Sequence, residues 1–172
     1  MTRQYKVLWI EDDAHMDLSG LASPVHIAPQ YKLVTVLQVS EAVERILETE
    51  FDVIITDMRF KADKNPSWWD LAQARQNGNG KPGQNANFGD RLGLQLLYTL
   101  LGPDDERMIK IEVPPWITSD RFVVFTVEER ITIQDHLSKL KINHYERKQP
   151  GLPRRTLKNL IDKVLKERGL VG

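Results

Sequence analysis

The stretch DVIITD, residues 52–57, joins three apolar residues and a threonine in one run and follows them with an aspartate. A run this short, built mainly of β-branched residues, is typical of a strand whose two faces are both covered. Four other short stretches are also rich in β-branched or aromatic residues: KVLWI (6–10), KLVTVLQV (32–39), RFVVFT (121–126) and INHYER (142–147). The sequence therefore predicts five strands.

Helical patterns lie between and after these stretches. They cover residues 40–50, 93–101, 128–140 and 154–168. Ser40 stands where it could cap the first of these helices, and Gly169 indicates the end of the last. Strands that alternate with helices predict right-handed crossovers and a parallel sheet. We therefore expect a doubly wound α/β fold.

Three segments fit this pattern less well. Glycine and proline residues leave room for only a short helix between residues 13 and 30. Residues 60–90 form a polar, Gly- and Asn-rich insertion that we expect to be mobile around 76–87. Residues 102–120 form a second insertion, in which MIKIEV (108–113) could add a strand. The two insertions lie on either side of the helix predicted at residues 93–101, the third helix if the short one before residue 30 is counted.

The tryptophans of the insertions and the histidines suggest packing rather than chemistry. The tryptophans of the insertions are Trp68, Trp69 and Trp116. We expect them to fold back on the domain, and the alternative is that they expose a surface for a partner. The histidines are His15, His26, His136 and His144. They show no metal-ligand spacing, so we expect them to be surface or packing residues.

Composition narrows the classes of function. The 24 basic and 24 acidic residues balance, so no overall field favours nucleic acid or a membrane surface as a direct partner. The absence of cysteine excludes disulfides, thiolate metal sites and thiol nucleophiles. No apolar run reaches the ~20 residues needed to span a bilayer, and the N-terminus does not read as a signal peptide. We expect one cytoplasmic domain covering residues 1–172.

Polar residues follow four of the five predicted strands. The first strand ends in Glu11-Asp12-Asp13, the third in Asp57 and the fourth in Thr126, and the fifth reaches Lys148. Because the carboxyl ends of parallel strands meet at one edge of the sheet, these residues should converge in one crevice. Each residue alone has an ordinary explanation as a helix cap, loop acid, strand end or solvated charge, and their joint order favours a site.

This set of residue types suits phosphoryl transfer. Clustered carboxylates repel one another unless a cation lies among them, and oxygen ligands suit Mg²⁺. An ionised aspartate beside such an ion can attack phosphorus and form an aspartyl phosphate. The ammonium of Lys148 and the hydroxyl of Thr126 could then bind the phosphoryl oxygens.

The sequence resembles the receiver domains of two-component response regulators. The resemblance rests on these segments: VLWIEDD, VIITDMR, the helix start GLQLL at Gly93, FVVFT, and Tyr145 three residues before Lys148. It implies a flavodoxin-like sheet of strand order 2-1-3-4-5. It also implies a phosphoacceptor switch rather than a turnover enzyme, with a sensor histidine kinase or histidine phosphotransfer protein as donor. A downstream protein target would read the signal, and a homodimer is a further possible partner state.

The resemblance also assigns roles to individual residues. Glu11 and Asp12 would hold Mg²⁺ together with Asp57 and the backbone carbonyl of Arg59. Asp57 would be the phosphoacceptor, and Lys148 would bind the phosphate. Thr126 would provide the switch hydroxyl, and Tyr145 would be the aromatic ring that rotates. Arg59 and Glu128 would flank the phosphoryl site. Such a pair could close the mouth of the site against water.

Three features depart from the family pattern and leave alternatives open. Val127 stands where a small residue is usual, Gln149 separates Lys148 from Pro150, and no Met-Pro follows Asp57. The second interpretation is a receiver-like interaction domain with vestigial phosphorylation. The third is a phosphohydrolase of the haloacid-dehalogenase type. That class needs Asp-x-Asp after the first strand, and Glu11 occupies the nucleophile's position.

Overall fold

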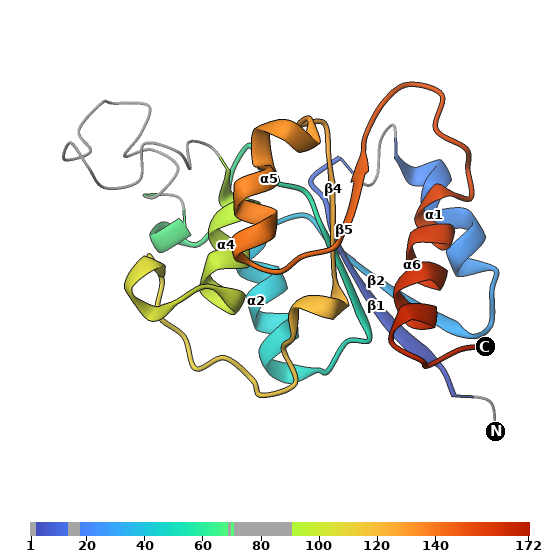
Figure 1. Cartoon of the computed structure of the whole chain (residues 1–172), viewed down its shortest axis with the longest axis horizontal. Coiled ribbons are helices and arrows are strands. Elements are labelled where there is room, and N and C mark those ends of the chain that lie inside the picture. Colours follow the sequence, from blue (N-terminus) through green and yellow to red (C-terminus); the bar gives the residue numbers. More distant parts are fainter. Residues whose placement is uncertain (1–2, 14–17, 69, 71–90) are drawn as a thin grey trace.

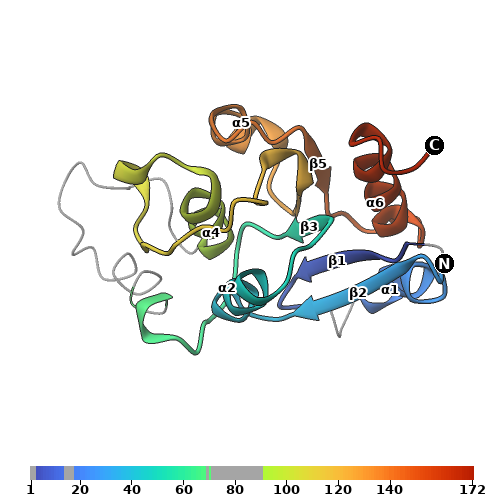
Figure 2. The same cartoon turned by 90° about the horizontal axis from the view of Figure 1, so that it is seen from below.

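The computed structural model describes residues 3–13, 18–68, 70 and 91–172. Within them the strands form one sheet, ordered β2-β1-β3-β4-β5, in which every neighbouring pair is parallel (Figure 2). The strands are β1 (Tyr5–Ile10), β2 (Tyr31–Val36), β3 (Val53–Thr56), β4 (Phe122–Thr126) and β5 (His144–Arg147). The predicted doubly wound fold and its strand order are confirmed.

Helices cover both faces of the sheet (Figure 1). One face carries α1 (Ser19–His26) and α6 (Thr156–Glu167). The other carries α2 (Val39–Glu48), α4 (Leu92–Leu101) and α5 (Arg130–Lys139). None of the described helices combines the length and the apolar character needed to cross a membrane.

Alternation along the buried strands divides the core into two clusters. In β1, Leu8 and Ile10 pack toward α2 and α4, whereas Val7 and Trp9 pack toward α1 and α6. All four are at most 1% exposed. Successive side chains of a strand point to opposite faces, so an unbroken apolar run fills both layers. The prediction that these strands are covered on both faces is therefore confirmed for β1.

The start of α2 differs from the prediction that Ser40 caps it. The helix begins at Val39, after an extended Gln38. The carboxylate of Asp63 accepts hydrogen bonds from the backbone N–H of Ser40 at 2.9 Å and from its hydroxyl at 2.5 Å. A carboxylate from the insertion thus satisfies the free amide at this helix terminus, which local sequence could not indicate.

Two further predictions are confirmed, one about the length of the first helix and one about the end of the last. The helix between residues 13 and 30 is short, and α1 contains Pro24 within its eight residues. The chain leaves α6 through Gly169, whose φ of +68° is easily reached only by glycine. The N–H of Leu170 then donates to the carbonyl of Leu165 at 2.9 Å, which closes the helix end.

The second insertion packs on the core without adding a strand, so the prediction for MIKIEV (108–113) is wrong. Ile109 and Ile111 are partly buried against the cluster that contains α2 and α4. Their apolar surface is used for packing, and the described residues offer this segment no strand ladder. The guanidinium of Arg121 lies 5.2 Å from the ring centroid of Trp116 and donates to the carbonyl of Phe51 at 2.7 Å.

Trp68 and Trp116 fold back on the domain as predicted. Trp68 is 3% exposed and belongs to the same core cluster, and Trp116 is partly buried against it. Trp69 lies outside the described residues, as does the segment predicted to be mobile around 76–87.

Replacing Trp68 with alanine should lower the free energy of unfolding by about 3 kcal/mol, because it removes a large buried ring. Urea denaturation measures the change, with Leu47→Ala as a control on a half-exposed apolar side chain of α2. A loss no larger than that of the control would show that the start of the insertion does not contribute to the core.

Candidate functional site

The strand register brings the predicted site residues to one edge of the sheet. Ile10 pairs with Thr56, and the N–H of Asp57 donates to the carbonyl of Ile10 at 3.2 Å. On the other side, Thr126 pairs with Arg147, and the N–H of the next residue, Lys148, donates to the carbonyl of Thr126 at 2.8 Å. Strands far apart in the sequence therefore end at the same level.

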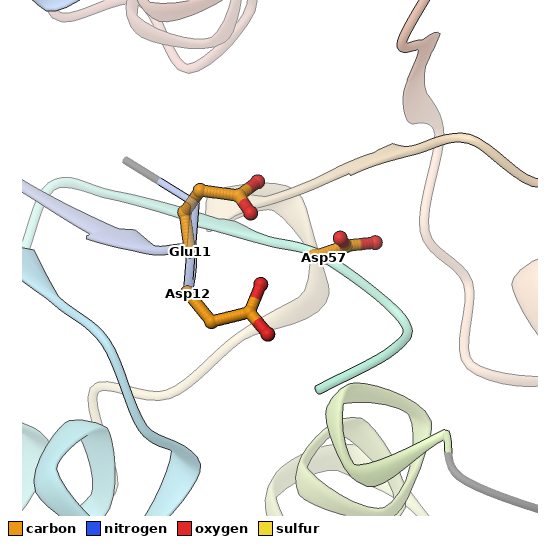
Figure 3. A group of neighbouring side chains, drawn as sticks. All are labelled: Glu11, Asp12 and Asp57. Atoms are coloured by element: carbon orange, nitrogen blue, oxygen red, sulfur yellow. The ribbon is translucent and has the colours of Figure 1, made fainter. Parts of the chain in front are cut away.

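Three carboxylates meet at this edge. Glu11 and Asp12 extend from the end of β1 on the same side as Asp57, which follows β3 (Figure 3). One oxygen from each lies within 4.8 Å of the others, so the group could hold a metal ion. Glu11 is fully buried and Asp57 is 6% exposed. An all-oxygen donor set of this kind suits a hard cation.

Lys148 balances part of this charge. Its Nζ donates to Oδ2 of Asp57 at 2.5 Å and forms an ion pair with Oε2 of Glu11. Burial raises the pKa of Glu11 to about 7, with the negative charge of Asp57 adding to the rise and Lys148 opposing it. One ammonium thus leaves the cluster with excess negative charge, which favours binding of a further cation.

The Asp57 side chain is fixed by the loop that follows it. Oδ1 accepts a hydrogen bond from the N–H of Met58 at 2.6 Å and a longer one from the N–H of Arg59 at 3.5 Å. Oδ2 faces the ammonium of Lys148. Backbone donors and an ammonium keep the carboxylate in one orientation at the sheet edge.

Gly93 allows helix α4 to pack directly on the Asp57 backbone. A Cβ at this position would lie 1.8 Å from the carbonyl oxygen of Asp57, far inside any normal contact. The N–H of Gly93 also donates to the carbonyl of Met58 at 3.1 Å. The predicted helix start at GLQLL is confirmed, and its glycine lets the helix approach the loop that carries Asp57.

Lys61 joins the two acidic loops and was not singled out from the sequence. Its backbone N–H donates to Oδ2 of Asp12 at 3.1 Å, and its ammonium donates to Oδ1 of Asp13 at 2.9 Å. These contacts tie the loop after β1 to the loop after β3. A lysine in a polar insertion gives no sequence signal for this role.

Glu128 is held mainly by an arginine that sequence reasoning missed. The predicted pair with Arg59 is present, with a separation of 3.5 Å. Arg91, just before α4, lies much closer, with its Nη2 2.5 Å from the same Oε1 atom. The Glu128 side chain is 6% exposed and the Arg91 side chain 14%. In the sequence, Arg91 is marked only by its position immediately before an apolar helix. That position does not indicate Glu128 as its partner unless the fold is known.

Thr126 and Tyr145 both contact the loop that contains Glu128. The buried hydroxyl oxygen of Thr126 accepts from the N–H of Glu128 at 3.4 Å. The phenol of Tyr145 donates to the carbonyl of Glu128 at 2.5 Å, and its ring is half-buried beside the guanidinium of Arg130. The two residues expected to act together are therefore joined through one loop.

His136 and His144 make packing contacts, His26 is exposed, and no histidine of the described residues belongs to a group that could hold a metal ion. Nδ1 of His136 shares a hydrogen bond with the Tyr98 hydroxyl at 2.9 Å, and burial lowers the pKa of His136. His144 is buried and lies 3.2 Å from a carboxylate oxygen of Glu167. His15 lies outside the described residues.

A pocket of about 720 Å³ lies over the acidic cluster. Asp12, Asp57 and Lys148 line one part of it. The two residues that depart from the family pattern, Val127 and Gln149, also line it. They therefore lie at the entrance to the site and not in the core.

The architecture is similar to that of solved response regulators. A putative response regulator from Chloroflexus aurantiacus matches with a TM-score of 0.56 and 13% identity over 95% of this chain and 99% of its own. A receiver domain protein from Clostridium thermocellum matches with a TM-score of 0.55 and 16% identity over 96% and 98%. The chemotaxis response regulator CheY4 of Vibrio cholerae gives 0.54 and 14% over 94% and 99%.

The chain has the receiver fold. At these identities the likeness establishes the architecture, and the resemblance noted in the sequence is confirmed at that level. No protein-family model matches the chain, and no curated protein matches it either. The function of this receiver-fold protein must therefore be argued from its own residues.

Gly93→Ala should destabilise this receiver-fold protein by about 2 kcal/mol or more, because the added methyl group meets the Asp57 carbonyl. Gly20→Ala in α1 is the matched control, since its Cβ would meet nothing within 4 Å. The control should be neutral or stabilising by up to about 1 kcal/mol. Urea denaturation of both variants measures the difference, and equal stabilities would contradict the close approach of α4.

Glu11→Gln should stabilise the metal-free protein more at pH 8 than at pH 5. The pKa of Glu11 is about 7 in the folded protein and has a reference value of 4.5. The folded state therefore holds the proton more tightly, and stability falls as pH rises between these values. The gain from glutamine should be about 2 kcal/mol larger at pH 8. Denaturation in EDTA tests this, and an equal gain at both pH values would contradict it.

Proposed function

We propose that this protein is a response-regulator receiver domain that accepts a phosphoryl group on Asp57 in a Mg²⁺-dependent reaction. The observation that carries the proposal is the contact of one lysine, Lys148, with both Asp57 and Glu11 at the carboxyl edge of a parallel sheet. An acceptor carboxylate, a group of acids and an ammonium are the parts that aspartyl phosphate formation needs.

The residues present fit a magnesium ion. Glu11, Asp12 and Asp57 offer oxygens within 4.8 Å of one another, and the backbone carbonyl of Arg59 would complete the protein ligands. Burial raises the pKa of Glu11 to about 7, so its negative charge is costly unless a cation lies beside it. When bound, the ion would neutralise charge on the phosphoryl oxygens.

The chain's own groups then have distinct tasks. Asp57 provides the attacking oxygen, and the amides of Met58 and Arg59 hold its other oxygen in place. Lys148 would shift its ammonium from the carboxylate to a phosphoryl oxygen as the phosphate forms. Thr126, at the end of the neighbouring strand, would donate its hydroxyl to a second phosphoryl oxygen.

The signal would leave the site through the loop after β4. Movement of Thr126 toward a phosphate would draw Glu128, which it contacts through the Glu128 N–H. Tyr145 donates to the carbonyl of the same residue, so its ring would be released to turn inward. The result is a population shift on the face formed by α5, β5 and α6.

The partners follow from this activity. The phosphoryl donor would be a sensor histidine kinase or a histidine phosphotransfer protein, and the output would be contacts with a downstream protein target or a second copy. We treat residues 1–172 as one receiver unit, with residues 60–90 and 102–120 as insertions in it.

Acetyl phosphate or phosphoramidate with Mg²⁺ should add one phosphate to the wild type and none to Asp57→Asn. The amide cannot attack phosphorus, so labelling should fall to background. Asp135→Asn, the same change at an exposed position of α5, should label like the wild type. Intact-protein mass spectrometry provides the count, and equal labelling of wild type and Asp57→Asn would refute the proposal.

Arg59→Ala should speed loss of the phosphate by about two- to fivefold, the scale of one partly exposed ion pair. Its guanidinium reaches Glu128 at 3.5 Å and is 43% exposed, so the pair can restrict water at the mouth of the site. The decay of phosphorylated protein by mass spectrometry measures the rate. A rate equal to that of the wild type would remove Arg59 from this role.

A further inference from the structure

The second insertion contains a strand-like segment that has no strand beside it. From Met108 to Val113 the residues alternate between exposed and partly buried. This is the two-residue period of a strand that lays one face on the core. Figure 1 shows this part of the chain, between α4 and β4, running along the outside of the molecule. The sheet formed by the described strands does not include it.

Segment 109–113 is held in place by the domain. On its inner face Ile109 and Ile111 are partly buried against the core cluster that contains α2 and α4. Before it, the guanidinium of Arg107 donates to a backbone carbonyl at the end of α4 at 2.9 Å. After it, the N–H of Ile117 donates to the carbonyl of Pro114 at 3.1 Å. A segment fixed in this way loses little conformational freedom when a partner binds.

The backbone of segment 109–113 carries unused hydrogen-bonding groups. None of its amides or carbonyls is hydrogen-bonded to another group among the residues that the structure describes. A strand edge with free N–H and C=O groups readily pairs with a strand of another chain. Pro114 and Pro115 follow directly and have no N–H to donate, so the edge ends there.

The outer face of the segment carries one charge of each sign. Lys110 and Glu112 are both exposed, and neither forms an ion pair within the described part of the chain. Antiparallel pairing of two copies, centred on Ile111, would place Lys110 of each copy directly opposite Glu112 of the other. Parallel pairing in register would instead place like charges side by side. The segment is therefore complementary to itself in the antiparallel direction.

We infer that segment 109–113 is a dimer interface, in which it pairs antiparallel with the same segment of a second copy about a two-fold axis at Ile111. Two-fold symmetry repeats each contact, so the interface contains two pairs of Lys110 with Glu112. The same register places Met108, which is 46% exposed, opposite Pro114. No residue of the phosphoryl site takes part, so the inference goes beyond the proposed function.

The expected dimer is weak, because a short strand pair buries less than the ~1,600 Å² of a standard interface. We expect a dissociation constant on the order of 100 µM. Sedimentation equilibrium of the full chain between about 10 µM and about 1 mM measures it.

The first experiment reverses the charges one at a time. Lys110→Glu and Glu112→Lys each turn two attractive pairs into two repulsive ones, so each should raise the dissociation constant about tenfold. Lys163→Glu on α6 and Glu48→Lys on α2 make the same changes at exposed positions away from the segment. These two controls should dimerise like the wild type, and thermal denaturation confirms that every variant remains folded.

Combining the two reversals should restore the dimer. The double variant Lys110→Glu/Glu112→Lys again places opposite charges together, so its dissociation constant should return to within about threefold of the wild-type value. An equimolar mixture of the two single variants should form a heterodimer of similar strength, because each new charge then faces its opposite. A general effect of either substitution on folding or solubility would not be reversed in this way.

The second experiment tests the register by cross-linking. The chain has no cysteine, so introduced thiols are the only ones present. Lys110→Cys mixed with Glu112→Cys should form a mixed disulfide under mild oxidation, because directly opposite Cβ atoms lie about 4.5–5.5 Å apart. Lys163→Cys mixed with Glu112→Cys is the control and should give only background cross-linking. Intact-protein mass spectrometry identifies the mixed species.

The outcomes separate this inference from the proposed function. A wild type that stays monomeric up to about 1 mM overturns the inference, as does a dimer that Lys110→Glu does not weaken. A double variant that remains as weak as the single ones overturns the antiparallel pairing and the inference with it. Asp57→Asn should dimerise like the wild type. Failure of Asp57 to accept a phosphate would therefore refute the proposed function and leave the dimer interface standing.

Discussion

The ammonium of Lys148 lies between the carboxylates of Glu11 and Asp57, and the arrangement of the site depends on this contact. Three acids share a small volume at the edge of the sheet, and one ammonium cannot neutralise them all. Burial makes the excess charge costly, as the raised pKa of Glu11 reflects. Binding of a divalent cation would therefore stabilise this site. A phosphate on Asp57 would offer the Lys148 ammonium a second anionic partner. The parallel sheet produces this excess of negative charge because the strands that carry the acids end at the same edge.

The same edge is linked to distant parts of the domain through Glu128. Arg91 joins it to the start of α4, and Tyr145 joins its carbonyl to β5. Gly93 seats α4 on the Asp57 backbone two residues after Arg91. A change at the acidic cluster therefore has short physical routes to α4, α5 and β5. These routes consist of packed, hydrogen-bonded or ion-paired groups, as the proposed switch would require.

Most of the fold could be predicted because apolar runs and helix signals are local. The continuous runs predicted strands buried on both faces, and their alternation with helices predicted the parallel order. Predictions failed where a distant residue replaced a local one. Asp63 accepts hydrogen bonds from the N–H and hydroxyl of Ser40, the residue expected to cap the helix, and MIKIEV uses its isoleucines for packing instead of a ladder. Arg91 and Lys61 gave no usable signal because their partners are more than 35 residues away.

A crystal structure of the protein with Mg²⁺ and beryllofluoride, an analogue of the aspartyl phosphate, would test the central claim most directly. The account predicts one magnesium ion bound by the Glu11, Asp12 and Asp57 carboxylates, with beryllium bonded to an Asp57 oxygen. The Lys148 ammonium and the Thr126 hydroxyl should both contact its fluorides. A structure in which Lys148 still contacts Asp57 and Glu11, with neither magnesium nor beryllofluoride at the strand ends, would contradict the account.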